Sequence, residues 1–252
     1  MLLEGKAAIV TGAATGIGRA IARAYAREGA LVTINHLKRQ DMADSLHDEI
    51  IQLGGNALVF EADVTSEDEI LQMVNATKER FGSVDILVNC AGIQKFESLL
   101  SMELSTWNKI IETNLTACFL LIKACVPHMQ EHGSGCVVNI SSVHEDLAAG
   151  GNTAYCVSKS GLKMLMKCSA EEFARFGIRV NNIAPGATTT EMTAHVQRSP
   201  EQLNGLNSRI PLGRMGQSED IAELAVYLAS PQAGYITGST FMVDGGLHLK
   251  GW

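Results

Sequence analysis

Residues 7–18 read Ala-Ala-Ile-Val-Thr-Gly-Ala-Ala-Thr-Gly-Ile-Gly, and this stretch decides the fold. Its apolar start, Ala7–Thr11, is typical of a buried strand, and an amphipathic helical pattern follows over Ile17–Glu28. The glycines between them permit a tight turn and let the backbone approach a ligand closely. Because a helix N-terminus offers free N–H groups and the positive end of its dipole, this strand–turn–helix order predicts a pyrophosphate-binding turn.

The alternation of strand and helix continues along almost the whole chain. Short apolar runs without polar alternation suit strands that are buried on both faces of a parallel sheet. The expected strands are Ala7–Thr11, Leu31–Asn35, Ala57–Glu61, Ile86–Asn89, Cys136–Ile140, Ile178–Ile183 and Thr240–Val243. Amphipathic stretches lie between them, and Ser66-Glu67-Asp68-Glu69 reads as a capping box. The order predicts an α/β fold with a doubly wound parallel sheet of about seven strands.

No low-complexity linker, internal repeat or abrupt shift in charge divides the chain, so we expect one domain over residues 1–252. One segment differs from the rest, because residues 189–209 are polar and weakly periodic and contain Pro200. It falls between the sixth and seventh expected strands. We therefore expect this segment to act as a lid over a site at the carboxyl ends of the strands.

The composition argues against several classes of protein. Hydrophobic residues make up 46% of the chain and charged residues 19%, as in ordinary globular proteins. The formal net charge of −7 gives no reason to expect a nucleic-acid partner. No apolar run approaches the roughly 20 residues that span a bilayer, and residues 1–6 lack a secretory pattern. We therefore expect a cytoplasmic protein without a membrane partner.

The cysteines are scattered and include no Cys-x-x-Cys pair. They are Cys90, Cys118, Cys125, Cys136, Cys156 and Cys168. Several lie inside apolar runs, where a thiol behaves as a small hydrophobic group. Because closely spaced ligands with companion histidines are missing, we expect no metal site.

The end of the second expected strand bears on the choice of dinucleotide. In an NAD site, an acidic residue about 20 positions after the glycines binds the adenosine ribose. Here the strand ends in Asn35-His36-Leu37-Lys38-Arg39, without a carboxylate. Lys38 or Arg39 could instead accommodate a 2′-phosphate, so the sequence favours NADP, with NAD possible. The alternative is that both cations simply lie on a solvated surface.

A phenol and an amine stand four residues apart, at Tyr155 and Lys159, which places them on one face of a helix. A free tyrosine has a pKa near 10, and a neighbouring ammonium favours the phenolate form of such a side chain. Ser142 follows a strand earlier in the chain and could hydrogen-bond the same substrate oxygen. A lone Tyr-x-x-x-Lys is common on helices, but its occurrence with the glycine turn and this serine predicts an acid–base site.

With these residues in view, the chain resembles a classical short-chain dehydrogenase/reductase over essentially its whole length. The shared motifs are the Thr11–Gly18 turn, Asp63-Val64, Asn89-Cys90-Ala91-Gly92, Asn114, Ser142, Tyr155 with Lys159, and Pro185-Gly186. The resemblance implies a Rossmann-type fold and an NAD(P)-dependent enzyme that interconverts an alcohol and a carbonyl by hydride transfer.

The resemblance also implies roles for individual residues. Tyr155 would be the general acid/base, Lys159 would support it and bind the nicotinamide ribose, and Ser142 would orient the substrate. Asn114 would position a water in a proton relay to the lysine. The cofactor-binding residues, from the resemblance and from the motifs above, are Gly12, Thr15, Gly16, Ile17, Gly18, Asn35, Lys38, Arg39, Asp63, Val64, Asn89, Ala91, Gly92, Tyr155, Lys159, Pro185, Gly186, Thr188 and Thr190.

Two positions depart from the family's pattern. Cys90 stands where the family usually has the second asparagine of Asn-Asn-Ala-Gly, and a thiol cannot replace the hydrogen bonds of an amide. We therefore expect a change in local strand stabilisation without loss of a catalytic role. Thr188 stands where the family often has an aliphatic residue.

The substrate is less constrained than the reaction. Ser142-Val143-His144-Glu145 and residues 181–187 are similar to bacterial glucose 1-dehydrogenases. A sugar needs several polar partners, because each buried hydroxyl left unpaired is costly. We expect the substrate contacts to include Gln94, Ser142, His144, Glu145 and Tyr155, with Asn152 and Thr189 close by and Glu97 as a weaker candidate. A polar loop without ligand contact remains the alternative for His144 and Glu145.

Two other functions stay open. The same machinery could reduce a 3-oxoacyl carrier-protein thioester or another ketone, but an acidic carrier protein needs a basic patch, which Glu145, Asp146 and Glu191 do not provide. A regulator that senses NADP without turnover would typically lack Tyr155 or Lys159, and both are present.

The family resemblance further implies a homotetramer. Its surfaces would include the helix of Tyr155 and the end near 241–252. The apolar residues Leu247, Leu249 and Trp252 would be buried there or pack on their own subunit.

Overall fold

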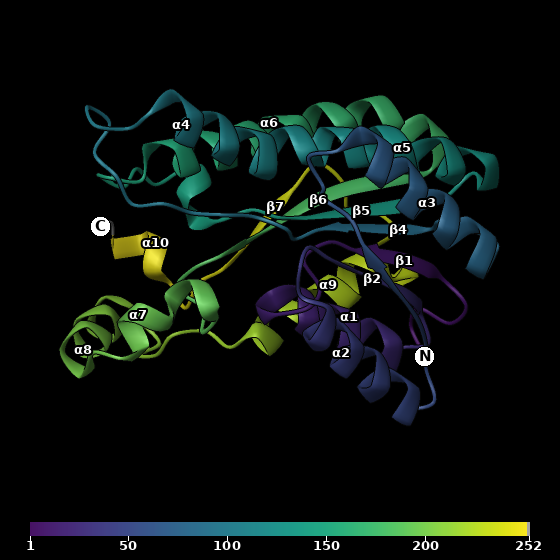
Figure 1. Ribbon diagram of the computed structural model, residues 1–252, viewed down its shortest axis with the longest axis horizontal. Coiled ribbons are helices and arrows are strands. Elements are labelled where there is room, and N and C mark those ends of the chain that lie inside the picture. The colour runs from purple at the N-terminus through teal and green to yellow at the C-terminus, as the bar shows by residue number, and fades with distance from the viewer. Residues whose placement is uncertain (251–252) are drawn as a thin grey trace.

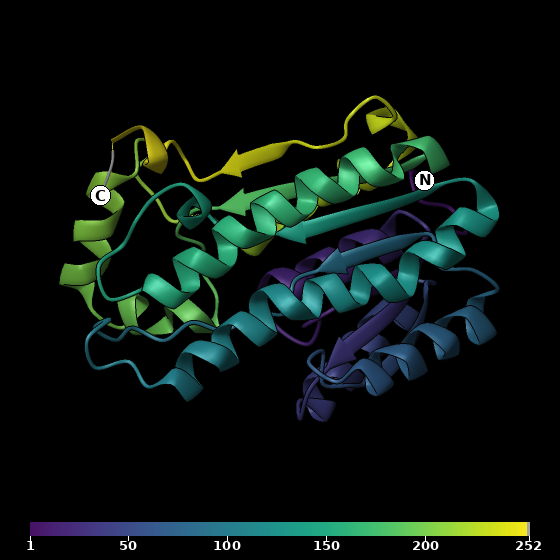
Figure 2. The same cartoon turned by 90° about the horizontal axis from the view of Figure 1, so that it is seen from above.

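The expected strands form one parallel sheet in the order β3-β2-β1-β4-β5-β6-β7 (Figures 1 and 2). In this computed structural model, which describes residues 1–250, they are β1 Ala7–Val10, β2 Leu31–His36, β3 Asn56–Glu61, β4 Ile86–Asn89, β5 Gly135–Ile140, β6 Ile178–Pro185 and β7 Thr240–Val243. The expected bounds differ only at some ends, most at β6, which continues to Pro185. The doubly wound α/β fold is thus confirmed.

Helices cover both faces of the sheet (Figure 1). They are α1 Gly16–Arg27, α2 Gln40–Gln52, α3 Glu67–Phe81, α4 Leu104–Ile111, α5 Ala117–His132, α6 Thr153–Phe173, α7 Ala194–Gln197, α8 Pro200–Arg209, α9 Ser218–Ala229 and α10 Leu247–Lys250. α1, α2 and α9 lie on one face, and α3, α5 and α6 lie on the other.

Each face has its own hydrophobic core, because successive strand residues point to opposite sides of the sheet. In β1, Ala8 and Val10 join the core under α1 and α9, whereas Ile9 joins the core under α3 and α5. Both faces of the strands are therefore buried, which is why the strands lack the polar alternation of a sheet with one solvated face.

The long helical stretch Leu104–His132 packs on the second core. By length and composition alone it could cross a membrane, with a mean hydropathy of 1.5 in its most apolar window. Of that window, 44% is buried inside the protein. Leu121, Ile122 and Cys125 contribute to the core, and this packing accounts for the apolar composition.

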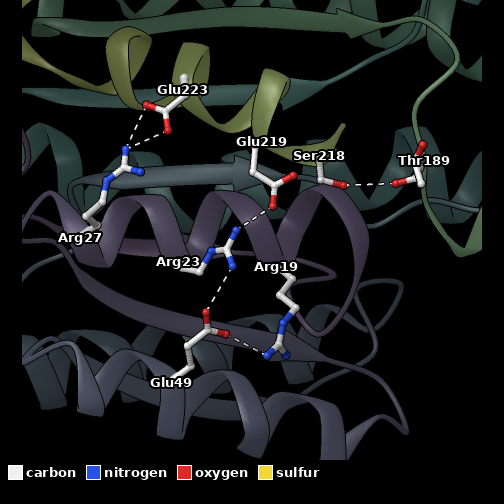
Figure 3. Close-up of polar contacts among 8 residues, drawn as sticks. All are labelled: Arg19, Arg23, Arg27, Glu49, Thr189, Ser218, Glu219 and Glu223. Atoms are coloured by element: carbon white, nitrogen blue, oxygen red, sulfur yellow. Dashed lines mark hydrogen bonds and ion pairs between the residues drawn. The ribbon is translucent and has the colours of Figure 1, made fainter. Parts of the chain in front are cut away.

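An ion-pair network joins α1 to the helices on either side of it (Figure 3). Its three arginines recur every fourth residue of α1, so they lie along one face of the helix. The pairs are Arg19 with Glu49 of α2 (3.0 Å), Arg23 with Glu49 (3.3 Å) and with Glu219 of α9 (2.7 Å), and Arg27 with Glu223 of α9 (2.9 Å). The network holds together the three helices that cover this face of the sheet.

Arg23 bridges two carboxylates, so replacing it by methionine should destabilise the protein modestly. Exposed ion pairs contribute about 0.2–1 kcal/mol each. We expect Arg23→Met to lower the melting temperature by about 2–4 °C in 50 mM NaCl and by less in 1 M NaCl, because salt screens the pairs. Arg198→Met is a matched control, since no ion pair of Arg198 with a described residue is found. Equal shifts at both salt concentrations would contradict an electrostatic origin.

Three local expectations are refined by the structure. Ser66 does cap α3 by accepting a hydrogen bond from the Glu69 N–H at 3.3 Å. The Glu69 carboxylate, however, accepts from the N–H of Asp63 at 2.7 Å, so it does not make the reciprocal bond of the capping box to the backbone of Ser66.

Near the C-terminal end, Leu247 packs on its own subunit against Ile210 and Met215. Leu249 is 75% exposed, and Trp252 lies outside the described residues.

Residues 189–209 contain more regular structure than their weak periodicity indicates. They comprise the turn η4 (Glu191–Thr193), α7 and α8, and the Ser199 hydroxyl caps α8. In both views these helices lie beyond the end of the sheet to which the strand arrows point (Figures 1 and 2).

Candidate active site

A crevice of about 840 Å³ follows the carboxyl edge of the sheet. Its walls come from the turn after β1, from the segments after β2 to β6, and from residues 190–193. In open α/β sheets, ligands bind at this edge, where the strand order reverses. Here the reversal lies between β1 and β4, which flank the glycine turn.

The glycine turn has the backbone geometry of an anion cradle. Gly12 adopts φ +62°, and a Cβ there would lie 3.0 Å from the Cα of Ala91. A Cβ on Gly18 would lie 2.4 Å from the carbonyl oxygen of Gly12. Thr15, the N-cap residue before α1, makes no side-chain capping bond, and the first turn of the helix holds no acidic residue. The N–H groups of α1 are therefore available to a phosphate, and the site fits a dinucleotide.

Asn35 supports this turn from the neighbouring strand. Its Oδ1 accepts from the N–H of Gly12 at 3.3 Å, and its Nδ2 donates to the carbonyl of Ala62 at 3.0 Å. The side chain is buried and also lines the crevice. The amide thus fixes the turn, a role that the sequence motif alone does not reveal.

The two cations after β2 both line the crevice. Lys38 has φ +54°, a left-handed conformation that is uncommon for a residue with a side chain, and its N–H donates to Glu61 at 3.1 Å. The Arg39 guanidinium lies 3.3 Å from the carboxylate of Glu191, which belongs to η4. Arg39 therefore joins the strand edge to the segment expected to be a lid.

His36 is a crevice residue that our sequence reasoning did not select. It is buried at the end of β2, and its Nδ1 accepts from the N–H of Arg39 at 3.3 Å. Its place beside Asn35, at a strand end facing the glycine turn, is the signal that identifies it. The other lining residues that we did not predict are Ala14, Leu37, Ala62, Thr65, Cys90, Ile93, Lys109, Glu112, Thr113, Ile140, Ser141, Glu191, Met192 and Thr193.

The acid–base residues meet in the same crevice. Tyr155 and Lys159 come from the first turns of α6, and Ser142 lies in the segment between β5 and the short helical turn η2 (Val143–Glu145). Lys159 Nζ lies 5.6 Å from the centre of the Tyr155 ring and donates to the carbonyl of Ile140 at 2.8 Å. The Ser142 hydroxyl accepts from the N–H of His144 at 3.1 Å. A hydroxyl, a phenol and an ammonium are thus available to one bound ligand.

Asn114 lies beside the crevice without lining it. It occupies a π-helical turn, η1 (Glu112–Thr116), between α4 and α5. Its amide exchanges hydrogen bonds with the backbone of Ile93, accepting at 2.8 Å and donating at 2.9 Å, and also donates to Ser158 at 3.1 Å. Asn114 therefore holds the loop after β4 against α6, while the water-binding role implied by the family stays a prediction.

Asn89 is also not among the residues that line the crevice, so the cofactor contact implied for it by the family resemblance stays a prediction. Its side chain is buried and donates to Asn139 Oδ1 at 2.8 Å, across the pair of strands. Every other predicted cofactor residue lines the crevice: Gly12, Thr15, Gly16, Ile17, Gly18, Asn35, Lys38, Arg39, Asp63, Val64, Ala91, Gly92, Tyr155, Lys159, Pro185, Gly186, Thr188 and Thr190.

The loop that begins at Cys90 is fastened by Thr11. The Thr11 hydroxyl accepts from the N–H groups of Cys90 and Ala91, at 3.0 and 3.1 Å. Burial raises the pKa of the Cys90 thiol to about 12, so this thiol is protonated at neutral pH. An uncharged thiol therefore stands where the family usually has an asparagine. The backbone N–H groups of the loop have the Thr11 hydroxyl as their partner.

The predicted substrate residues divide into two groups. Ser142 and Tyr155 line the crevice, but Gln94 and His144 do not. His144 is half-buried, its Nδ1 lies 3.0 Å from the Leu147 carbonyl oxygen, and its ring packs edge-on against Tyr155 at 6.0 Å. Burial lowers the pKa of His144, which favours its neutral form. His144 therefore contacts Tyr155 and does not itself line the crevice.

Glu145 differs most from our expectation, because its side chain is fully buried, pairs with Lys163 and does not line the crevice. Asn152 is buried as well, and neither its Nδ2 nor its Oδ1 has a partner among the described residues. Thr189 faces α9, where its carbonyl accepts from Ser218 (Figure 3). Glu97 pairs with Lys95 at 2.9 Å. Polar residue type alone did not distinguish a side chain that faces the crevice from one that is directed into the protein.

The fold and the site together define a dinucleotide-dependent α/β oxidoreductase. A family model described as enoyl-(acyl carrier protein) reductase matches residues 12–248. Glucose 1-dehydrogenase 2 of Bacillus subtilis (strain 168) is 39% identical over 249 residues, which are 98% of this chain and 96% of the relative. A 3-oxoacyl-[acyl-carrier-protein] reductase of Synechocystis sp. is 40% identical over 248 residues, 98% of each chain.

A solved structure gives the same result. The gluconate 5-dehydrogenase from Burkholderia cenocepacia J2315, in complex with NADP and tartrate, superposes with a TM-score of 0.92 at 33% identity, over 97% of this chain and 96% of that one. The chain belongs to the short-chain dehydrogenase/reductase family. It is an NAD(P)-dependent oxidoreductase that acts on CH–OH groups.

Proposed function

We propose that the protein is a sugar dehydrogenase that oxidises an aldose at C1 and prefers NADP. The observation that carries the reaction is the meeting of Ser142, Tyr155 and Lys159 in the crevice that the glycine turn opens. The sugar assignment is supported by the likeness to a glucose 1-dehydrogenase and to a gluconate 5-dehydrogenase.

The side chains divide the chemistry between them. The bound nicotinamide supplies the hydride acceptor in the oxidative direction. Tyr155, as phenolate, takes the proton from the substrate hydroxyl, and Ser142 donates a hydrogen bond that holds the same oxygen. Lys159 donates to the Ile140 carbonyl, which fixes its ammonium beside the crevice and near the Tyr155 ring. Asn114 keeps the loop after β4 in place and holds Ser158 of α6.

The preference for NADP rests on the edge of the crevice after β2. Lys38 and Arg39 line it, and the position where NAD enzymes carry a carboxylate holds none. The Arg39–Glu191 ion pair shows that this guanidinium reaches an anionic group across the mouth of the crevice. A 2′-phosphate would take the place of the Glu191 carboxylate.

Replacing Arg39 should therefore change cofactor preference selectively. Hydrogen bonds to charged groups contribute about 1.5–3 kcal/mol, so we expect Arg39→Ala to weaken NADP binding about 10-fold or more while NAD binding changes little. Glu191→Gln should act in the opposite direction and tighten NADP binding, because it removes the competing carboxylate. Fluorescence titration with NADPH and NADH measures both. A strict NAD requirement of the unmodified protein would contradict this assignment.

A second candidate, reduction of a 3-oxoacyl carrier-protein thioester, is favoured by the Synechocystis relative. A panel distinguishes the two candidates: glucose, other aldoses, polyols and acetoacetyl thioesters, each with NAD(H) and NADP(H), followed at 340 nm. We expect turnover of an aldose with NADP. A strong preference for the thioester would overturn the sugar assignment.

We further propose that residues 189–209 close over the bound substrate and that the protein is a homotetramer. The first proposal is supported by Glu191, Met192 and Thr193, which line the crevice from this segment. The second is supported by exposed apolar side chains on α5 and α6, namely Phe119, Val157 and Met164. Light scattering after gel filtration tests the tetramer.

A further inference from the structure

Glu145 is a buried carboxylate that the reaction described above does not use. It ends the turn η2 (Val143–Glu145), which follows Ser142 directly, and its side chain is 0% exposed. A carboxylate removed from water is costly unless it is paired and hydrogen-bonded. Its partners therefore indicate what this group does.

Two of these partners lie on α6, the helix that carries Tyr155. Lys163 Nζ lies 3.2 Å from Glu145 Oε1, and the Ser160 hydroxyl donates to the Glu145 carbonyl at 2.8 Å. In the other direction, the Glu145 N–H donates to the carbonyl of Ser142 at 2.9 Å. One residue thus binds both the backbone of Ser142 and the helix of Tyr155.

The third partner is the last member of a row of buried amides across three strands. Asn89 of β4 donates to Asn139 of β5 at 2.8 Å, and Asn139 donates to Asn182 of β6 at 2.9 Å. These residues are register neighbours in the parallel sheet. Asn182 then donates to Glu145 Oε2 at 3.4 Å. Every amide in the row donates in the direction of the Glu145 carboxylate. The hydrogen bonds therefore polarise one another, and the negative charge of Glu145 accepts the last of them.

Neutralising Lys163 does not require Glu145. Lys163 also pairs with Asp146, whose side chain is 51% exposed and has no hydrogen bond to the row of amides among the described residues. What Glu145 alone supplies is a link between three parts of the site: the Ser142 turn, the Tyr155 helix and the carboxyl edge of β4 to β6.

We infer that Glu145 is a positioning residue for the reaction, because its buried carboxylate fixes the Ser142 hydroxyl relative to the Tyr155 phenol. This role depends on the functions proposed for Ser142 and Tyr155. A misplacement of about 1 Å in a reacting constellation can lower the rate by as much as about 100-fold. Loosening this link should therefore slow the chemical step and leave the cofactor end of the crevice unchanged.

Glu145→Gln and Asp146→Asn form a matched pair, since each removes one carboxylate from Lys163. With the best alcohol from the panel, we expect kcat of Glu145→Gln to fall at least about 10-fold, with KM changing less than kcat. The primary deuterium isotope effect on kcat should rise toward its intrinsic value. The dissociation constant for NADPH should stay unchanged, and Asp146→Asn should match the unmodified protein in all these measurements.

Lys163→Met removes the other half of the link and should reproduce the loss in kcat. The double variant should be no worse than either single one, because residues that act as a unit are not additive. If the link had a purely structural role, these variants would have a lower melting temperature. Their kcat and isotope effect, measured below that temperature, would then be unchanged.

Three results would overturn this role. Glu145→Gln with unchanged kcat and isotope effect would show that the link is not needed. Equal loss of turnover and NADPH binding would show a general disturbance of the fold. Full activity of Tyr155→Phe would instead remove the proposed acid–base chemistry, and with it the geometry that Glu145 would maintain.

Discussion

Tyr155→Phe should lose at least about 10²–10⁴-fold in turnover, the contribution of general acid–base catalysis. The phenylalanine ring keeps the packing against the edge of His144 and the position above Lys159, so the crevice keeps its shape. Only the proton acceptor is removed. The substrate alcohol then lacks the phenol that is proposed to take its proton as hydride leaves.

The measurement is the rate at saturating substrate and cofactor, together with the dissociation constant for NADPH. The binding constant should change little, because the glycine turn and the strand edges are untouched. Tyr235→Phe is the matched control, since Tyr235 is fully exposed in the loop before β7. Wild-type turnover of Tyr155→Phe, with the chemical step limiting the rate, would show that another group moves the proton.

Gly18→Ala should weaken dinucleotide binding about 100-fold. The added Cβ would lie 2.4 Å from the Gly12 carbonyl oxygen and 3.1 Å from the Cα of Ala13. Both are backbone atoms, so the turn itself must move, and overpacking of this kind costs about 1–3 kcal/mol. The upper part of that range corresponds to about 100-fold in a dissociation constant. Titration with NADPH measures the loss.

Gly205→Ala is the control for this experiment. Gly205 lies within α8, where a Cβ meets nothing within 4 Å and the backbone has no positive φ. Alanine should favour the helix there by about 1 kcal/mol and leave cofactor binding unchanged. If Gly18→Ala bound NADPH as tightly as Gly205→Ala, the close approach of turn and helix would not matter for the ligand.

The sheet and the two ends of the crevice could be predicted because local patterns specify them. Each buried strand reads as an apolar run, the glycines follow β1 directly, and the helical spacing places Tyr155 and Lys159 on one face. These features depend on residues close together in the sequence. The family resemblance then related them to one another.

The remaining features depend on contacts between distant residues. Arg39 and Glu191 are 152 positions apart, and no local sequence pattern predicts the ion pair between them. Glu145 is polar and follows Ser142, so its residue type favoured a substrate contact, whereas Lys163 and Asn182 draw its carboxylate into the interior. Residue type predicts what a side chain can bind, but packing decides which way it faces.

The π turn that contains Asn114 makes the number of residues matter as well as their identity. A π turn holds one more residue than a regular turn of the same helix. Deleting a residue between Glu112 and Thr116 would restore regular geometry while rotating every side chain on one flank by about 100° relative to the other. Among homologous sequences, we therefore expect an alignment without gaps across these five positions, even where the residues themselves vary.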